Sequence, residues 1–436
     1  MRCLLVILDG LGDRPADILN GTTPLQAALT PNLDALAASG INALMYPISP
    51  GIAPSSDIAH FTIFGYSSNE YPGRGYIETL GEGIPIDDLD VAFRTSFISV
   101  KEEDGSFIIT GRSMRGHVDT GYELAKSIPG DVLYGTEMKF VYTGLRQGLL
   151  LLKGDVSADV TDADPLEAGL PIAEVQPTAD ASDREKAANT ARVVNEFMLR
   201  TYVRIKDEDM NFLATKWAGQ KKDIDPFYEK TSLHGAIVAE GPLYKGLATY
   251  TGMDFVEVKD EDKPWSDLAR RLDTALDLLA EGRDFVHVHT KVPDHAGHRK
   301  DPLLKKSQIE ELDKAFARLI RPVKDDKDLL VVVTADHATT SQGDLIHSGE
   351  PVPMVMTGPT TGKDTVDKFD EFSARLGSLG CVYGRDVMPL ILNYTDRIRY
   401  LGSRVFPGNI TARPTLDRIK PLRPTHDGRV KSEDNL

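Results

Sequence analysis

The sequence predicts an α/β protein with a parallel sheet flanked by helices and interrupted by a smaller α+β insertion. Apolar runs too short for helices, at residues 3–8 and 329–333, are typical of parallel strands buried on both faces. Stretches with helical spacing alternate with these runs, which favours helices on both sides of the sheet. Between about residues 90 and 180, short apolar runs are broken by Gly, Asp and Pro, which indicates a separate insertion.

The N-terminal part begins with a strand over residues 3–8. A helix follows over residues 30–40, in which Thr30 can cap the helix, Pro31 fits its first position and Gly40 can end it. Its apolar side chains fall on one face. A strand followed by a helix begins an α/β fold.

The C-terminal half repeats this alternation. The sequence predicts helix, strand, helix and strand in turn, over residues 265–281, 285–289, 307–322 and 329–333. The middle of the chain instead has a meander-like pattern, with short runs at residues 92–100, 107–110, 138–142 and 148–152. We therefore expect a discontinuous core domain (1–90 and 180–412), an inserted domain (90–180) and a charged, proline-containing mobile tail (413–436).

The composition excludes several classes of protein. Hydrophobic residues make up 41% of the 436 residues and charged residues 27%, as in a globular domain. No apolar run approaches the ~20 residues of a membrane helix, and no signal-peptide cleavage site follows the apolar N-terminus. The formal charge of −16 disfavours nucleic acid and anionic lipid as partners but not a small anionic substrate. Two cysteines cannot build a disulfide framework. A cytoplasmic location is expected, and no oligomeric state is predicted.

Side chains that bind metals follow three predicted strands. In an open α/β sheet, ligands bind beyond the carboxyl ends of the strands. Imidazole and carboxylate groups in this number suit Zn²⁺ or Mn²⁺. A buried charge at a strand end is costly unless it is paired or metal-bound, so the functional interpretation is favoured for the pair after the third strand. The candidates are Asp9, Asp294, His298, Asp336, His337 and, ten residues later, His347.

Each of these residues also has an ordinary interpretation when it is taken alone. An Asp-Gly pair such as residues 9–10 is typical of a turn. The four-residue spacing of Asp294 and His298 also suits a salt bridge on a helix surface. His287 and His289 alternate with valines along a strand, and both are interpreted as structural. Only the constellation as a whole predicts a metal site.

A candidate nucleophile lies in residues 51–60, where Ser55 and Ser56 follow a proline. Serine at this place is also typical of a helix N-cap, and the two interpretations are compatible. At a helix N-terminus, backbone N–H groups and the positive end of the helix dipole face any anion that the serine carries. A metal ion beside the hydroxyl would lower its pKa and activate it.

Taken together, these motifs resemble the alkaline phosphatase superfamily and, more closely, the archaeal-type 2,3-bisphosphoglycerate-independent phosphoglycerate mutases. The resemblance covers roughly residues 1–400. The superfamily motifs are Asp9-Gly10, Thr23-Pro-Leu25, Thr30-Pro-Asn-Leu-Asp34, Ser55-Ser-Asp-Ile-Ala-His60, Thr334-Ala-Asp-His337 and His347-Ser-Gly-Glu-Pro-Val-Pro353. The closer match adds Gly73-Arg-Gly75, Gly81-Glu-Gly83, Asp90-Val-Ala-Phe-Arg94 and His289-Thr-Lys-Val-Pro-Asp-His-Ala-Gly-His298.

The resemblance implies an alkaline-phosphatase-like core that binds two divalent metal ions (Mn²⁺, Zn²⁺ or Mg²⁺). It implies that phosphoryl transfer through a phosphoserine at Ser56 interconverts 2-phosphoglycerate and 3-phosphoglycerate in glycolysis and gluconeogenesis. Lys291 matches a lysine that contacts the phosphoryl group in the family. The implied ligands are Asp294, His298 and His347 for one ion, and Asp9, Asp336, His337 and Ser56 for the other.

The small phosphorylated acid must be held by cations, several at once, while the insertion closes over it and excludes water. The candidates are Arg74, Arg94, Arg112, Arg115, Arg146, Lys216 and Lys291. The sequence departs from the family here. Relatives usually have an Asp-Arg-Arg-Ala-Gly-Arg run, a His-Arg pair, an arginine and an asparagine, where this chain has Arg112-Ser-Met-Arg115-Gly-His117, Leu145-Arg146, Lys216 and Ser96. Each change touches residues that would hold the glycerate carboxylate or handle its hydroxyl proton, and lysine is not equivalent to arginine at such a site.

Two other functions are weighed. A phosphotransferase or phosphomonoesterase of the same superfamily acting on another substrate, including the homoserine-kinase-like branch, would share the metal half of the site. A non-catalytic binding protein that kept the fold is disfavoured by the complete set of candidate ligands. Product analysis with Mn²⁺ and 3-phosphoglycerate distinguishes these possibilities.

Overall fold

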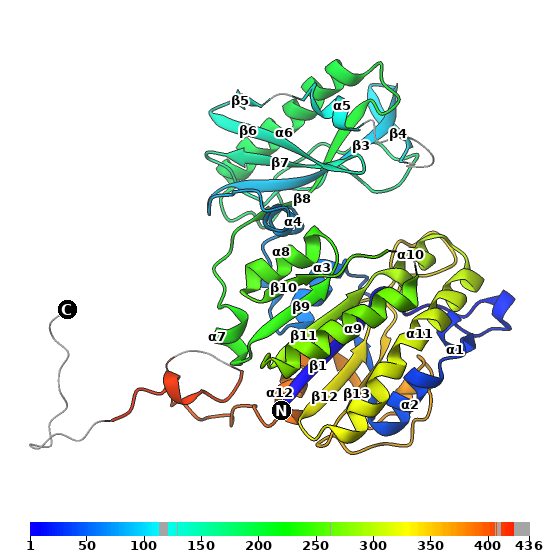
Figure 1. Cartoon of the computed structure of the whole chain (residues 1–436). Helices are drawn as coiled ribbons and strands as arrows, with labels where there is room; N and C mark the ends of the chain where they lie inside the picture. Colours follow the sequence, from blue (N-terminus) through cyan, green and yellow to red (C-terminus); the bar gives the residue numbers. More distant parts are fainter. Residues whose placement is uncertain (113–120, 129, 262, 406, 408–410, 423–436) are drawn as a thin grey trace, which may run out of the picture.

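The computed structural model describes residues 1–112, 121–128, 130–261, 263–405, 407 and 411–422. Two lobes meet at helix α4 (Arg74–Gly81), as Figure 1 shows. The larger lobe is built on an eight-stranded sheet and the smaller lobe on a six-stranded sheet. Each sheet has its own cluster of buried apolar side chains.

The larger lobe contains the predicted alternation of strands and helices. Its strands are β1 (Arg2–Leu8), β2 (Ile41–Tyr46), β9 (Gly235–Ala239), β10 (Asp254–Glu257), β11 (Phe285–Thr290), β12 (Leu329–Thr334), β13 (Val352–Thr357) and β14 (Gly380–Tyr383). Its helices, besides α4, are α1 (Pro24–Ala27), α2 (Pro31–Ser39), α3 (Ser56–Ile63), α7 (Phe227–Thr231), α8 (Pro242–Thr251), α9 (Pro264–Ala280), α10 (Val292–His298), α11 (Pro302–Asp325) and α12 (Gly384–Tyr394). The strands lie in the order β10-β9-β11-β1-β12-β13-β2-β14.

Strand β1 lies at the centre of the sheet, between β11 and β12 and parallel to both. Every side chain of β11 and β12 is buried, so both faces of the sheet are covered here, as the unbroken apolar runs predicted. The carboxyl ends of the three strands meet at one edge, because Leu8 pairs with Thr290 and Ile7 with Thr334. This edge receives the residues that follow each strand.

One strand of the large sheet runs against the others. Strand β13 is antiparallel to both β12 and β2, whereas the remaining pairs are parallel. The chain between β12 and β13, residues 335–351, contains no helix. A parallel pair needs a crossover connection and an antiparallel pair does not, so the chain returns directly alongside β12. The prediction of a parallel sheet is confirmed for the rest.

The smaller lobe is the predicted insertion. Its strands are β3 (Val91–Glu103), β4 (Ser106–Gly111), β5 (Asp131–Leu133), β6 (Thr136–Gly144), β7 (Gln147–Lys153) and β8 (Phe212–Gln220), and its helices are α5 (Gly121–Ala125) and α6 (Arg184–Ile205). All strand pairs in this sheet are antiparallel.

The predicted end of the insertion near residue 180 is wrong. Strand β8 pairs with β3 from Ile98↔Phe212 to Val91↔Gln220. Helix α6 buries Val193, Val194 and Phe197 in the apolar cluster of the same sheet. The insertion therefore extends to about residue 220. Its second part was missed because α6 has the spacing of an ordinary amphipathic helix, which either domain could bury.

The two lobes are joined by close backbone packing around α4. A Cβ atom on Gly81 would lie 1.7 Å from the carbonyl oxygen of Pro242, and one on Gly246 would lie 1.9 Å from that of Ile77. On the other side, a Cβ on Gly75 would lie 2.1 Å from the carbonyl oxygen of Ala92, in β3. Helix α4 is thus held tightly between helix α8 of the core and the sheet of the insertion.

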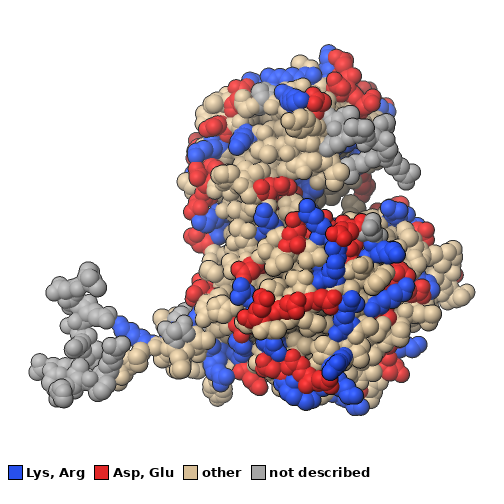
Figure 2. Space-filling model, viewed as in Figure 1, with Lys and Arg blue, Asp and Glu red and all other residues tan. Residues whose placement is uncertain are grey.

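The surface and the C-terminal segment complete the molecule. On the face in Figure 2, acidic and basic side chains are interspersed over both lobes. None of the described helices is long and apolar enough to cross a membrane. The predicted mobile tail, 413–436, is described as far as residue 422, where Arg418 donates hydrogen bonds to the carbonyl oxygens of Tyr228 and Glu229. The rest of it lies outside the described residues.

Candidate metal centre

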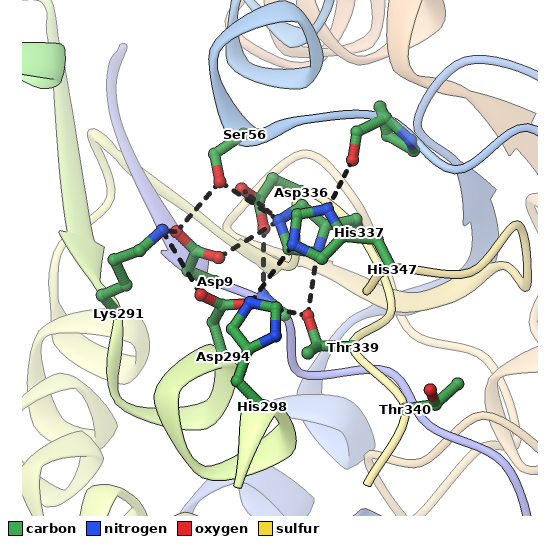
Figure 3. Close-up of polar contacts among 12 residues, drawn as sticks. Asp9, Ser56, Lys291, Asp294, His298, Asp336, His337, Thr339, Thr340 and His347 are labelled. Carbon is green, nitrogen blue, oxygen red and sulfur yellow. Dashed lines mark hydrogen bonds and ion pairs between the residues drawn. The ribbon is translucent and has the colours of Figure 1, made fainter. Parts of the chain in front are cut away.

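The candidate ligands meet at the carboxyl edge of the three central strands (Figure 3). Asp9 follows β1 directly, Asp294 lies in the short helix α10 after β11, and Asp336 and His337 follow β12. His347 reaches the same place from the loop before β13. Parallel neighbours bring their following loops together, which explains why residues far apart in sequence converge here.

One compact group consists of Asp294, His298 and His347, whose ligand atoms all lie within 4.8 Å of one another. The Nε2 atoms of His298 and His347 lie 3.1 and 3.5 Å from Asp294 Oδ1. His298 is one helical turn from Asp294, so both side chains point to the same side of α10. His347 is oriented through its other nitrogen, which lies 2.8 Å from the carbonyl oxygen of Pro54.

A second compact group consists of Asp9, Asp294 and His337. It differs from the predicted set by containing Asp294 in place of Asp336. Asp336 lies beside it, with Oδ2 3.4 Å from His337 Nε2 and with Oδ1 accepting a hydrogen bond from the backbone N–H of Gly10. Asp294 thus belongs to both groups, which places the two groups directly next to each other.

Ser56 is the first residue of α3 and lies against the second group. Its hydroxyl donates to Asp9 Oδ2 at 3.3 Å, and its Oγ lies 3.1 Å from His337 Nε2. The side chain is almost completely buried. Ser55 takes the N-cap position of α3, although its side chain makes no capping hydrogen bond. Of the two serines, Ser56 is therefore the one in contact with the candidate ligands.

Lys291 supplies the positive charge beside the carboxylates. Its ammonium lies 3.0 Å from Asp9 Oδ2 and 3.4 Å from Asp294 Oδ2. Burial opposes ionisation of Asp9, but Lys291 and the hydrogen bonds with His289 and His337 hold the pKa of Asp9 well below its usual value. Burial and the charge of Asp9 likewise oppose ionisation of Asp294, yet contacts with His298, His347 and Lys291 lower its pKa. Both carboxylates are therefore ionised at neutral pH.

Three residues that contact the candidate ligands were not predicted. His289, which was interpreted as structural, lies with Nε2 2.9 Å from Asp9 Oδ2, and Tyr244 donates to the same oxygen at 3.0 Å. Thr339 donates to Asp294 Oδ1 at 2.7 Å and lies 3.1 Å from His337 Nδ1. His289 is the last histidine before the Lys291 segment, which was an available signal. Tyr244 and Thr339 have no motif that marks them. His287, by contrast, lies in the core with Nδ1 near the carbonyl oxygen of Leu5.

The residues of the site fit a divalent cation. Asp9 Oδ1 and Asp336 Oδ2 are fully buried and accept no hydrogen bond of good geometry from the described residues. Both lie near one nitrogen, His337 Nε2, at 3.2 and 3.4 Å, and a single N–H cannot satisfy both. Burying carboxylate oxygens that are incompletely paired is costly, and a cation would offset that cost. Carboxylate oxygens and imidazole nitrogens are also the ligands that Zn²⁺ and Mn²⁺ accept. Burial lowers the pKa of the His289 imidazole to about 4, so its ring is neutral at physiological pH.

Three of the predicted substrate cations come together at the base of the insertion, around Trp217. The guanidinium carbon of Arg74 and the ammonium of Lys216 lie 4.5 and 4.7 Å from the ring centroid, and the guanidinium carbon of Arg94 lies 5.7 Å from it. Arg74 also faces Asp57, the neighbour of Ser56, at 3.7 Å. The cluster is therefore connected to the N-terminus of α3.

These cations are paired with carboxylates in the structure. Arg74 and Arg94 both contact Glu78, and Arg112 and Lys216 both contact Asp164. Burial and the neighbouring Arg94 and Arg112 lower the pKa of Lys216 to about 7. Lys216 lies on β8, so it belongs to the insertion and not to the returning core, where the sequence had placed it.

The remaining candidates of the insertion are less informative. Arg146 is buried, and its backbone N–H donates to the hydroxyl of Tyr142. Leu145 beside it is exposed. Ser96 lies on β3 opposite Ala214 of β8. Arg115 and His117 lie outside the described residues.

Comparisons with known proteins agree with this geometry. Residues 1–394 match the Metalloenzyme superfamily. The 2,3-bisphosphoglycerate-independent phosphoglycerate mutase 2 of Methanocaldococcus jannaschii is 38% identical, over 93% of this chain and 95% of that relative. The corresponding enzyme of Methanopyrus kandleri is 37% identical, over 92% of this chain and 98% of that relative.

Two solved structures are similar over nearly the whole chain. A Pyrococcus horikoshii protein has a TM-score of 0.72 at 29% identity, covering 92% of this chain and 99% of its own. The cofactor-independent phosphoglycerate mutase of Thermoplasma acidophilum has a TM-score of 0.57 at 31% identity, covering 91% of this chain and 100% of its own. The chain belongs to the Metalloenzyme superfamily, binds divalent metal, and is a member of the 2,3-bisphosphoglycerate-independent phosphoglycerate mutases, which are isomerases.

Proposed function

We propose that this protein interconverts 2-phosphoglycerate and 3-phosphoglycerate through a phosphoserine on Ser56, with two divalent metal ions. The observation that carries this proposal is the position of the Ser56 hydroxyl. It lies between Asp9 and His337, at the start of helix α3, in a chain whose relatives over more than nine tenths of its length are named phosphoglycerate mutases.

Two ions fit the site because Asp294 is shared by two adjacent ligand groups. Asp294, His298 and His347 would hold one ion, and Asp9, Asp336, His337 and Ser56 the other, with Asp294 between them. When bound, the ions lower the pKa of the serine hydroxyl and neutralise charge on the phosphoryl oxygens. Mn²⁺, Zn²⁺ and Mg²⁺ are the candidates, and the two imidazoles of the first group favour Mn²⁺ or Zn²⁺ over Mg²⁺.

The residues of the chain divide the reaction between the two lobes. Ser56 gives up its hydroxyl proton as Oγ attacks phosphorus, the bond between phosphorus and the substrate oxygen breaks, and that oxygen takes up a proton. Lys291 and the backbone N–H groups at the start of α3 orient the phosphoryl oxygens. The insertion retains the free glycerate and excludes water. The other hydroxyl of glycerate then loses its proton and attacks the phosphorus of the phosphoserine, the bond between phosphorus and Ser56 Oγ breaks, and Oγ takes up a proton, which restores Ser56.

The test is product analysis of the purified protein, stripped of metal and then supplied with Mn²⁺ and 3-phosphoglycerate. The proposal expects 2-phosphoglycerate in excess over free phosphate. Free phosphate alone would identify a phosphomonoesterase, and no product would contradict both. The protein without metal is the control for chemistry at this site, and repeating the assay with Zn²⁺ and Mg²⁺ identifies the ion that supports turnover.

A further inference from the structure

Behind the metal centre, a lysine side chain is enclosed by oxygen atoms. Lys305, on helix α11, has no solvent-exposed surface. Its ammonium donates to the carbonyl oxygens of Gly10, Gly12 and Thr339, at 2.8, 2.9 and 2.7 Å. The carboxylate of Asp13 lies 3.1 Å away. Four oxygen atoms thus surround the three N–H donors of one buried ammonium.

The reaction itself gives no reason for this arrangement. The oxygen atoms bound by Lys305 are backbone carbonyls and Asp13, and none of them is a candidate metal ligand. Burying an ammonium costs desolvation free energy unless its donors are fully paired. An apolar side chain at this position would fill the same space without that cost. A role in which only an ammonium suffices is therefore indicated.

The carbonyls belong to two loops that both carry candidate ligands. The loop after β1 contains Gly10 and Gly12 and begins at Asp9, and its Gly10 N–H also holds Asp336. The loop after β12 contains Thr339, which follows His337 by two residues. The two loops also bind each other directly, because Thr339 N–H donates to the carbonyl oxygen of Gly12 and Ser341 N–H donates to the Asp13 carboxylate. Lys305 adds a bond from helix α11 to both loops at once.

Thr339 passes this constraint to the ligands. Its carbonyl accepts from Lys305, while its hydroxyl donates to Asp294 Oδ1 at 2.7 Å and lies 3.1 Å from His337 Nδ1. Gly10 packs closely against Thr339 and Asp294, since a Cβ on Gly10 would lie 2.5 Å from Thr339 Oγ1 and 2.8 Å from the Cα of Asp294. A shift of the Lys305 ammonium would therefore move ligands of both groups.

We propose that Lys305 is the positioning residue of the metal centre. Its ammonium draws the two ligand loops onto helix α11, so that Asp9, Asp294 and His337 face one another before any ion binds. Without it, three buried carboxylates, those of Asp9, Asp294 and Asp336, would repel one another with less positive charge nearby. This inference rests on metal binding by the chain and not on the identity of the substrate.

The test measures, by isothermal titration calorimetry, the affinity of metal-free protein for Mn²⁺ in the wild type and in Lys305→Met. Residues that orient metal ligands typically change metal affinity by ~10–100-fold when they are replaced. We expect a loss of that size for Lys305→Met. Lys300→Met is the matched control, because Lys300 also binds backbone carbonyls of the second loop, at Thr340 and Leu345, but does not contact the first. It should keep the wild-type affinity.

The melting temperature in the presence of a chelator separates positioning from general stability. A Lys305→Met variant that melts earlier but binds Mn²⁺ like the wild type would overturn the proposal. If that variant does not fold, Thr339→Val decides, because it keeps the carbonyl that Lys305 binds and removes only the hydroxyl contacts to Asp294 and His337. Wild-type affinity in Thr339→Val would then overturn the proposal. These measurements stand even if phosphoglycerate is not the substrate.

Discussion

Asp294 is the side chain on which the two ligand groups depend, because it contributes to both. Its neighbours also show what sequence reasoning can reach at the scale of single residues. Asp294, His298 and His347 were predicted from motifs, since ligands that follow strand ends leave a recognisable spacing. The hydroxyls of Thr339 and Tyr244 were not, because a threonine or tyrosine that orients a ligand looks like any other until the fold places it.

The position of Ser56 leads to a first prediction. Ser56→Ala removes the hydroxyl that lies between Asp9 and His337, so no phosphoenzyme should form and turnover should fall by at least ~10³-fold. Ser55→Ala changes only the N-cap residue of α3, whose side chain makes no capping bond, and should retain most activity. Trapping labelled phosphoenzyme in both variants checks this. Labelling of Ser56→Ala but not of Ser55→Ala would assign the nucleophile to Ser55.

Glu371 leads to a prediction about pH. Burial raises its pKa from 4.5 to about 7, although the hydroxyl of Thr23 and the charge of Lys305 favour the ionised form. The folded protein therefore binds this proton more tightly than the unfolded chain. Its contribution to stability is fully present below pH ~4.5 and is lost as the pH rises towards 7.

Urea unfolding of metal-free wild type and Glu371→Gln across this range measures the effect. The difference between the two proteins should shift in favour of the glutamine variant by on the order of 3 kcal/mol between pH 4.5 and 8. A constant difference would mean that Glu371 keeps an ordinary pKa in the folded protein.

At the scale of elements, the strands and helices of the central region were predictable because their burial leaves a clear periodicity. The strands found as β1, β11 and β12 and the helices found as α2, α9 and α11 all had such patterns. The antiparallel course of β13 and the assignment of β8 to the insertion were not predictable. Both depend on which strand a segment pairs with, and pairing is decided by tertiary packing rather than by local sequence.

The contact between helices α4 and α8 gives a prediction at this scale. Gly246→Ala would place a methyl group 1.9 Å from the carbonyl oxygen of Ile77, so the helices must separate. We expect a loss of at least ~2 kcal/mol, even though alanine is the better helix former. Gly111→Ala is the control, since its nearest neighbour would lie 3.6 Å away and the change should stay within ~0.5 kcal/mol. Equal unfolding free energies for the two variants would show that the helix contact adapts.

At the scale of the whole molecule, the general arrangement was predicted but the extent of the insertion was not. Short apolar runs broken by Gly, Asp and Pro in residues 90–180 indicated a second unit. The candidate metal ligands agreed with this, because none of them lies between Ser56 and Asp294. The sequence could not show that α6 and β8 close that unit. Nor could it show that Arg74, Arg94 and Lys216 gather around Trp217, because the three residues come from different elements.

The division of labour between the lobes gives the last prediction. We expect the insertion to close over the centre and to retain glycerate through its cations. Replacing Arg94 and Arg146 together by alanine should therefore reduce phosphoryl return to glycerate more than it reduces hydrolysis of a small aryl phosphate. The ratio of the two rates in one preparation is the measurement, and Arg192→Ala, on the exposed face of α6, is the control. An equal fall in both rates would assign the insertion a purely structural role.

The way the insertion is attached has a consequence for exchange between proteins. The chain enters it through β3 and leaves it through β8, and these strands pair side by side at Val91 and Gln220. Paired Cα atoms in an antiparallel ladder are only ~4.5–5.5 Å apart, which is a gap that a tight turn can bridge. Both chain connections of the inserted lobe therefore lie at one place. Recombination at this strand pair would exchange the whole inserted lobe between relatives without altering any strand of the main sheet.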